Sequence, residues 1–332
     1  MTGGAGAKSV SEPPERQGER TGTTLQFLPV SPLHTLCYAE FGNPAGIPLV
    51  FLHGGPGSSA QAALASLFLP DRYRLILFDQ RGCGRSTPQG ALVHNTLAAL
   101  VQDIEALRRH LGIARWVVYG GSWGATLALE YAKAHRERVS GLLLRGSFLA
   151  RTRDLDWFVA PDGVAQSFPQ AYQAVQEQLQ PIRGEQLYDA LYRRLLTHGQ
   201  DFAGALQAAR AWEQWENAVM GFVSEPATEP TPDLQQHFPL VAGRLIYAHY
   251  CVHHCFLPPE GVLSGIEVLA GMPLEIVHGR QDQVCLPEAA STLQHLLPQA
   301  RLQQVDAGHG MHEAGIRAGI VAGLERLAGQ LV

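Results

Sequence analysis

The sequence predicts an α/β fold in which a mostly parallel sheet is flanked by helices and carries an inserted helical cap. After residue 22, β-rich runs alternate with helical runs, and repeated strand–helix–strand order implies parallel strands. The alternation stops from residue 151 to residue 265, where the chain is mostly helical, and then resumes. We therefore expect a disordered tail at 1–22, a core formed by 23–150 and 266–332, and a cap at 151–265.

The first half of the expected core contains three strand signals and one helix signal. "TLCYAEFG" (Thr35–Gly42) alternates in polarity, whereas Ile47–Gly55 and Tyr73–Gly82 are nearly continuous apolar runs, typical of strands buried on both faces. "NTLAALVQDIEALRRHLG" then spaces its apolar residues as a helix does, and Gly112 is a plausible end of that helix.

The remaining elements follow the same order. "RWVVYGG", "WGATLALEYAKAH" and "VSGLLLRGSFL" read as strand, helix and strand. Beyond the cap, Pro273–Asp282 reads as a strand, Pro287–Leu297 as a helix, "RLQQV" as a short strand, and a last helix starts near Glu313. A helical insertion between two strands most simply covers the carboxyl edge of the sheet, where ligands bind in open α/β sheets.

Composition excludes several function classes. A net charge of −5 gives no reason to expect nucleic acid or an anionic membrane as a partner, and no apolar run is long enough for a membrane span. The first residues are rich in Gly, Pro, Glu and Ser and lack the apolar stretch of a secretory signal. Five scattered cysteines, an odd number, favour a reduced, cytoplasmic protein over a disulfide scaffold.

One pentapeptide carries a nucleophile signature. "GGSWG" (Gly120–Gly124) matches G-x-S-x-G, follows an apolar strand and opens a helix of small residues, which is the context of the nucleophile elbow in the α/β-hydrolase fold. The helix N-terminus would also stabilise negative charge near the serine. An ordinary glycine-rich turn is the alternative. The context favours Ser122 as a catalytic nucleophile.

A serine nucleophile needs a base and a group that orients the base, and this fold presents them in the order Ser, acid, His. Asp282 ends the strand "EIVHGRQD", and His309 follows the last strand in "VDAGHGMHE". Asp282 could instead cap the next helix, and His312 competes with His309. We expect the catalytic triad to be Ser122, Asp282 and His309, because His309 lies on the loop between strand and helix.

The oxyanion of a tetrahedral intermediate needs backbone donors. "HGGPG" (His53–Gly57) follows a strand and exposes backbone N–H groups. The natural pair of donors is the N–H of Gly55 with that of Trp123, the residue after the nucleophile. An ordinary Gly-Pro turn is the alternative reading.

Several segments together resemble the proline iminopeptidase (prolyl aminopeptidase) family of serine peptidases. They span the chain after its tail and read "HGGPG", "DQRGCGRS" (79–86), "GGSWGATLAL" (120–129), "LRGSFL", "ARAWEQWE" (209–216), "GRQDQVC" and "AGH". The resemblance implies an α/β hydrolase with a helical cap that releases N-terminal proline from peptides, without cofactor or metal. It assigns the triad and oxyanion residues as above, and it places Phe148 and Cys285 around the proline ring.

The resemblance also implies a clamp of two cap glutamates for the free amine of the substrate. Glu216, in "WEQWE", matches the first glutamate, but Tyr247 stands where the second is expected and Cys251 where a phenylalanine is expected. An esterase or amidase for small acyl groups is therefore the alternative function, and a binding protein without catalysis is a third. The sequence does not fix the oligomeric state.

The stretch "HYCVHHC" also contains residue types that bind metals. Its candidate ligands His249, Cys251, His253 and Cys255 do not all share one face of a helix. We therefore expect no metal site there.

Overall fold

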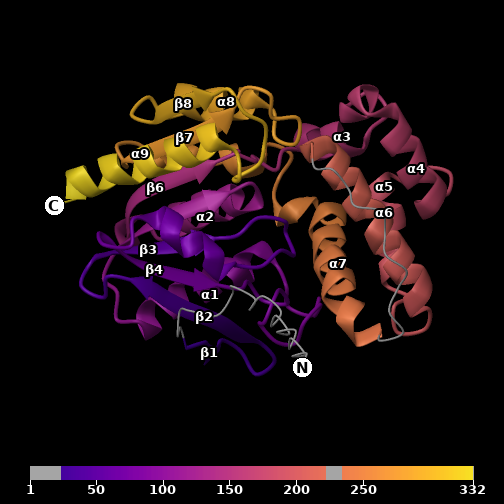
Figure 1. Ribbon diagram of the computed structural model, residues 1–332, viewed down its shortest axis with the longest axis horizontal. Coiled ribbons are helices and arrows are strands. Elements are labelled where there is room, and N and C mark those ends of the chain that lie inside the picture. The colour runs from indigo at the N-terminus through magenta and orange to yellow at the C-terminus, as the bar shows by residue number, and fades with distance from the viewer. Residues whose placement is uncertain (1–23, 222–233, 332) are drawn as a thin grey trace, which may run out of the picture.

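The computed structural model describes residues 24–221 and 234–331. The tail expected at 1–22 lies outside these described residues. Figure 1 shows a twisted sheet with helices against it and a separate group of helices, α3–α7, standing beside it. The predicted class, a mostly parallel sheet flanked by helices, is confirmed.

The sheet contains eight strands in the order β1-β2-β4-β3-β5-β6-β7-β8 among the described residues. The strands are β1 (Gln26–Pro29), β2 (Thr35–Gly42), β3 (Ile47–Leu52), β4 (Tyr73–Phe78), β5 (Trp116–Gly121), β6 (Val139–Arg145), β7 (Leu274–Gly279) and β8 (Arg301–Val305). From β4 to β8 every neighbour pairs in parallel, while β1 and β2 are antiparallel additions at one edge. The carboxyl ends of the parallel strands therefore meet at one edge of the sheet.

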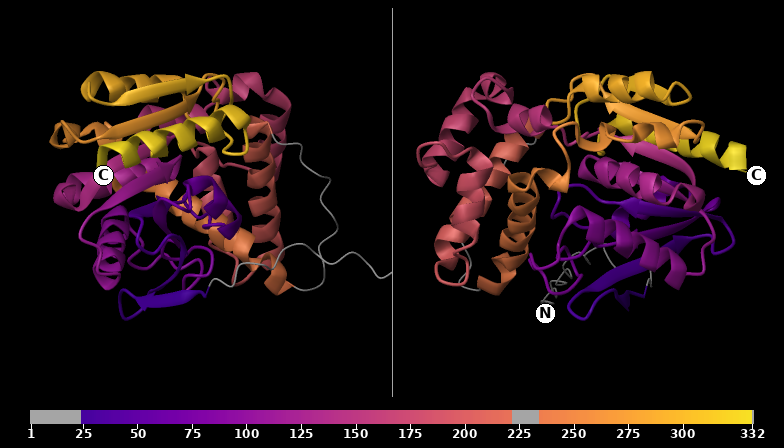
Figure 2. Two further views of the ribbon diagram at one scale, coloured as in Figure 1. Left: turned by 60° about the vertical axis from the view of Figure 1, so that its left-hand side comes forward. Right: turned by 180° about the vertical axis from the view of Figure 1, so that it is seen from behind.

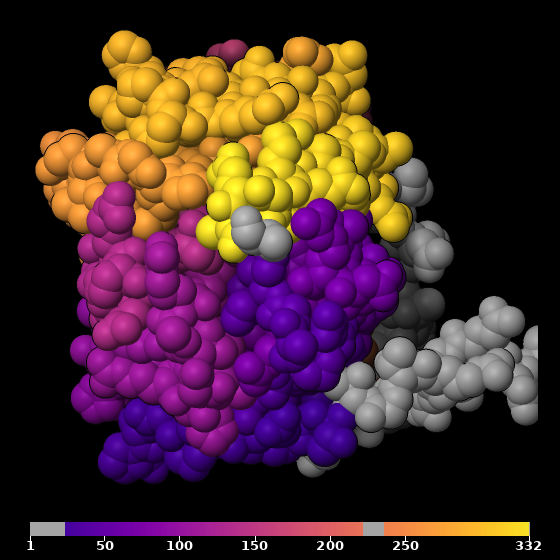
Figure 3. Space-filling model, turned by 90° about the vertical axis from the view of Figure 1, so that its left-hand side faces the viewer, coloured from indigo at the N-terminus to yellow at the C-terminus, as the bar shows by residue number. Residues whose placement is uncertain are grey.

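Both faces of the sheet are covered. Helices α1 (Leu97–His110), α2 (Trp123–Ala134) and α8 (Pro287–Leu296) bury their apolar sides in the core on one face. Helix α9 (Ala314–Leu331) and the 3₁₀ helix η1 (Ala62–Phe68) cover the other face. Figure 3 shows the side turned away from α3–α7, where α9 (yellow) lies beside segments from the first third of the chain (indigo to violet).

The remaining α-helices of the described ranges, five in number, lie between β6 and β7 in the chain. They are α3 (Thr152–Val159), α4 (Pro169–Leu179), α5 (Leu187–Leu195), α6 (Phe202–Met220) and α7 (Phe238–Val252). Both views of Figure 2 place them together at one end of the sheet. Aromatic side chains hold the group together, since Trp215 is almost fully buried and contacts the rings of Phe158 and Tyr172.

Several expected strands are shorter in the structure: the run 47–55 ends at Leu52, 73–82 at Phe78 and 273–282 at Gly279. The run expected to be a strand up to Leu149 ends at Arg145, because Gly146 takes a positive φ of 53° and leaves the extended conformation. Strand β1 was not predicted, since it is short and contains Pro29. No helix in the described ranges combines the length and the apolar character needed to cross a membrane.

Glycines allow α2 to start directly against the sheet. A Cβ on Gly124 would lie 2.0 Å from the carbonyl oxygen of Leu52 at the end of β3. A Cβ on Gly120 would lie 2.0 Å from the carbonyl oxygen of Gly124 itself. Any side chain at either position would push strand and helix apart, so both glycines are required for the tight turn that holds Ser122.

We expect Gly124→Ala to destabilise the protein by about 1–3 kcal/mol, because its methyl group overlaps backbone that cannot move aside. The measurement is urea unfolding, compared with Gly329→Ala. Gly329 lies on α9 with open space around its Cβ position, so alanine there is neutral or stabilising. Equal unfolding midpoints for the two variants would contradict the steric argument.

Candidate active site

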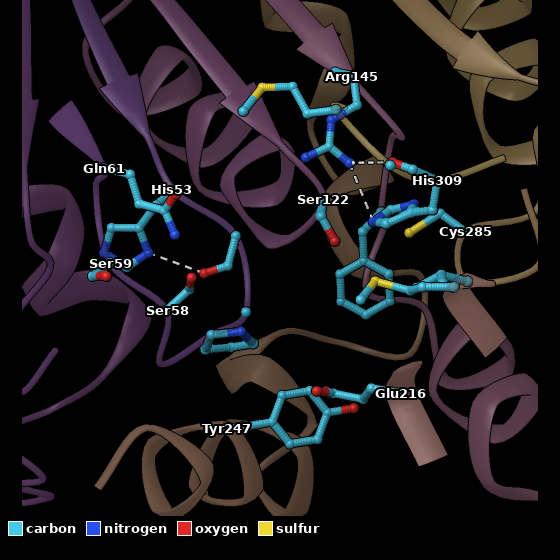
Figure 4. Close-up of a pocket in the computed structure, with 18 of the residues that line it drawn as sticks. His53, Ser58, Ser59, Gln61, Ser122, Arg145, Glu216, Tyr247, Cys285 and His309 are labelled. Atoms are coloured by element: carbon cyan, nitrogen blue, oxygen red, sulfur yellow. Dashed lines mark hydrogen bonds between the residues drawn. The ribbon is translucent and has the colours of Figure 1, made fainter. Parts of the chain in front are cut away.

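Ser122 occupies the sharp turn between β5 and α2. Its φ of 57° and ψ of −124° lie in a region that non-glycine residues rarely adopt, and its N–H donates to the carbonyl oxygen of Arg145 at 2.8 Å. The hydroxyl therefore stands out from the end of β5 into a cavity (Figure 4). This is the strained strand-to-helix geometry that the pentapeptide predicts.

Asp282 and His309 form a buried hydrogen-bonded pair. His309 Nδ1 lies 2.7 Å from Asp282 Oδ2, while the other carboxylate oxygen accepts the N–H groups of Val284 and Cys285, each at 2.9 Å. Burial alone would raise the pKa of Asp282, but His309 and these hydrogen bonds lower it. An ionised Asp282 accepts the Nδ1 proton, so His309 keeps a lone pair on Nε2.

In the described structure that lone pair faces Arg145 rather than Ser122. His309 Nε2 lies 3.2 Å from Arg145 Nη1, which also donates to the His309 carbonyl oxygen at 3.0 Å. Among the described residues no hydrogen bond joins Ser122 to His309, although both side chains line the same cavity (Figure 4). His312, the competing histidine, also lines the cavity, but it is His309 that forms the hydrogen bond with Asp282.

The predicted oxyanion donors flank Ser122. A Cβ on Gly54 would lie 3.4 Å from Ser122 Cβ, which places the "HGGPG" loop directly against Ser122. Gly55 lines the cavity. Trp123 begins α2, so its backbone N–H has no acceptor within the helix.

A buried polar network fixes these two loops relative to each other. The indole of Trp123 donates to the side-chain oxygen of Gln80 at 3.0 Å, and the Gln80 amide donates to the carbonyl oxygen of His53 at 2.8 Å. The Gln80 backbone N–H donates to His53 Nε2 at 3.0 Å. Burial lowers the pKa of His53, so the ring stays neutral and able to accept. The "HGGPG", "DQRGCGRS" and elbow segments therefore form one rigid unit.

The cavity has a volume of about 640 Å³ and lies between the strand ends and helices α3–α7. Seven of the residues predicted for the site line it, namely Gly55, Ser122, Phe148, Glu216, Tyr247, Cys285 and His309. Burial raises the pKa of the Cys285 thiol well above its usual value, against a smaller opposing contribution from its hydrogen bond with Ser122. The neutral thiol and the Phe148 ring therefore give the wall near Ser122 an apolar character.

Glu216 and Tyr247 lie together in the part of the cavity away from Arg145 and His309 (Figure 4). Glu216 is not a free carboxylate. Its Oε2 accepts from Arg244 Nη1 at 2.5 Å, and its Oε1 accepts from the indole of Trp212 at 3.0 Å. The Trp212 ring also packs on the Tyr247 ring, with centroids 5.3 Å apart. Burial raises the pKa of Glu216, and Arg244 opposes that rise.

Sequence reasoning missed the arginines that line the cavity, Arg145, Arg244 and Arg317. Arg145 is the last residue of β6, so it lies at the same edge of the sheet as Ser122 and Asp282. Arg244 lies one turn before Tyr247 on α7, so the sequence could have predicted that both residues share one helix face. Its pairing with Glu216 on α6 could not be predicted in this way. His249, from the "HYCVHHC" stretch, instead contacts the carbonyl oxygen of Asn95 at 2.9 Å.

Comparisons with known proteins agree with this architecture. A sequence profile described as the α/β-hydrolase fold matches residues 47–315. The chain is 41% identical to a probable proline iminopeptidase of Leptolyngbya boryana, over 92% of this chain and 94% of that protein. It is 40% identical to a proline iminopeptidase of Arabidopsis thaliana, over 90% of this chain and 78% of that protein.

A solved structure shares the fold at lower sequence similarity. An esterase from a Rhodococcus species superposes with a TM-score of 0.61 at 22% identity, covering 94% of this chain and all of the esterase. That likeness concerns the fold alone. On the sequence profile and the extent of identity to its relatives, the chain belongs to the proline iminopeptidase family of α/β hydrolases.

Proposed function

We propose that this chain is a serine aminopeptidase that releases N-terminal proline from peptides through an acyl-enzyme. The observation that carries the proposal is the arrangement around Ser122: a serine on a strained elbow opens into the same cavity as a histidine held by a buried aspartate. Relatives about 40% identical over most of the chain are proline iminopeptidases, which supports proline as the residue released.

The proposed reaction depends on proton transfer between Ser122, His309 and the leaving amine. Substrate entry displaces Arg145 from His309, whose Nε2 then accepts the Ser122 proton as Oγ attacks the carbonyl carbon of the first residue. The N–H groups of Gly55 and Trp123 stabilise the oxyanion, and the Asp282 carboxylate stabilises the imidazolium. His309 returns the proton to the departing amine as the C–N bond breaks. Water then attacks the acyl-enzyme by the same route and releases the free amino acid.

The walls of the cavity suit a compact ring. Phe148 and Cys285 lie beside Ser122, and an apolar wall of this kind complements a pyrrolidine ring better than a long polar side chain. In our proposal the segment 151–265 acts as a cap that closes the cavity over the strand ends. It contributes Glu216, Tyr247 and Arg244 to the lining.

We place the enzyme in the cytoplasm. All five cysteines fall within the described residues, and all five are unpaired and buried. Thiols that remain reduced are typical of proteins in a reducing compartment. The proposed partner is a small peptide with N-terminal proline.

We expect Ser122→Ala to lower kcat for a proline arylamide by a factor on the order of 10⁶, as for other serine nucleophiles. Ser59→Ala, which changes another serine of the cavity lining, should retain activity. Labelling by a fluorophosphonate should be lost only in Ser122→Ala. Turnover in Ser122→Ala close to that of the parent would refute the assignment of the nucleophile.

Asp282→Asn should lower kcat by about 10⁴-fold, because the amide no longer enforces the His309 tautomer that can accept a proton. The matched control is Asp306→Asn, whose side chain is 81% exposed and pairs only with the surface residue Arg280 among the described ion pairs. Steady-state hydrolysis of the proline arylamide measures both variants. Similar losses in the two would show that Asp282 has no special role.

A further inference from the structure

The end of the cavity beyond Ser122 has no unpaired negative charge to offer a substrate. Among the described residues that line the cavity, the carboxylates are Asp154 and Glu216. Asp154 binds Arg151 through both oxygens, at 2.6 and 2.9 Å. Glu216 binds Arg244 at 2.5 Å. Each carboxylate is therefore already paired with an arginine, although Arg151 also binds Glu288 at 2.9 Å.

Two further groups, Tyr247 and Glu213, lie close to the Glu216–Arg244 pair. Burial raises the pKa of the Tyr247 phenol well above its usual value, so the phenol stays neutral. Glu213, the second carboxylate near Arg244, lies 3.6 Å from Arg244 Nη2 and is 42% exposed, and it does not line the cavity. An ammonium group entering here would therefore compete with Arg244 for Glu216.

The Arg244 guanidinium also has one N–H donor without a hydrogen-bond partner among the described residues. Its Nε is buried and has no hydrogen-bond partner among the described residues, whereas its terminal nitrogens face Glu216 and Glu213. A buried donor without an acceptor costs free energy. The Glu216–Arg244 pair thus presents an acceptor and a donor side by side.

We infer that this cavity also accepts an N-terminal residue without positive charge, and that Arg244 is the specificity-determining residue for it. The best-matched class is a five-membered lactam, 5-oxoproline, at the amino terminus of a peptide. Its ring has the proline skeleton, its N–H would donate to Glu216, and its ring carbonyl would accept from Arg244. The inference rests on the proposed serine chemistry, which is unchanged at the scissile bond.

The reaction balances without a further reactant. Ser122 Oγ bonds to the exocyclic carbonyl carbon of the 5-oxoprolyl residue, and the bond from that carbon to the next nitrogen breaks. The serine proton passes through His309 to the departing amine. Water then cleaves the ester, which releases 5-oxoproline with a free carboxyl group and restores Ser122. The lactam ring stays closed throughout.

The test compares 5-oxoprolyl and prolyl arylamides on the parent enzyme and on Arg244→Met, which keeps a long apolar stem and removes the charge. We expect the parent to hydrolyse both. Arg244→Met should lower kcat/KM for the 5-oxoprolyl substrate at least about tenfold, the loss typical of a hydrogen bond to a charged group. It should raise kcat/KM for the prolyl substrate, because Glu216 is then free for the amine. A merely structural role would lower both.

Two further variants keep the inference testable if Arg244→Met folds poorly. Tyr247→Glu adds a carboxylate at the same end and should shift preference toward the prolyl substrate, whereas Arg244→Lys keeps the charge and should retain activity on the lactam. The control is Arg109→Met, which removes an exposed arginine of α1 that does not line the cavity and should leave both activities unchanged.

The outcomes separate this inference from the proposed function. Hydrolysis of the prolyl but not the 5-oxoprolyl substrate by the parent would overturn the inference and leave the peptidase intact. Equal responses of both substrates to Arg244→Met and to Tyr247→Glu would also overturn it. Hydrolysis of neither substrate by the parent, with no labelling of Ser122 by a fluorophosphonate, would refute the proposed function itself.

Discussion

The backbone contact between the start of α2 and the end of β3 determines where Ser122, the predicted nucleophile, lies. With glycine at 124, the first turn of the helix touches the Leu52 carbonyl, and with glycine at 120 the strand can turn back on that helix. Between them Ser122 is forced into an unfavourable φ/ψ region. The cost is local, of order 1–3 kcal/mol for such a residue, and the packing of β5 and α2 in the core offsets it.

The same contact explains why the polar loops around Ser122 are rigid. Trp123, the residue between Ser122 and Gly124, is fully buried and donates its indole N–H to Gln80. Gln80 in turn holds His53 through two hydrogen bonds. Trp123, Gln80 and His53 are all buried. A shift of one loop would therefore leave a buried polar group without a hydrogen bond, which costs about 1–3 kcal/mol. The loop that contains Gly55 is thus held against the Ser122 turn both by these hydrogen bonds and by close packing.

The parts of the site that could be predicted from sequence are those that follow from strand order. Ser122, Asp282 and His309 each come directly after a strand, and parallel strands bring such residues to one edge. The pairing of Arg244 with Glu216 could not be predicted, since it is set by the packing of α7 on α6, and two helices can meet at many rotations. The orientation of Arg145 toward His309 likewise depends on side-chain packing at the strand ends. Their catalytic and binding roles stay predictions, whereas the fold is confirmed.

One backbone contact joins α7 to the "HGGPG" loop (His53–Gly57) and so connects the two ends of the cavity. A Cβ on Gly57 would lie 2.0 Å from the carbonyl oxygen of Gly243, and a Cβ on Gly243 would lie 2.6 Å from that of Gly57. The two backbones therefore touch, and the residue after Gly243 is Arg244. The contact fixes the arginine that neutralises Glu216 relative to the loop that carries Gly55. Since the interior is close-packed, a displacement of α7 that moved Arg244 away from Glu216 would also strain the "HGGPG" loop. Under the proposed function, this contact couples the charge balance at the amino-terminal end of the substrate to the geometry of the proposed oxyanion donors.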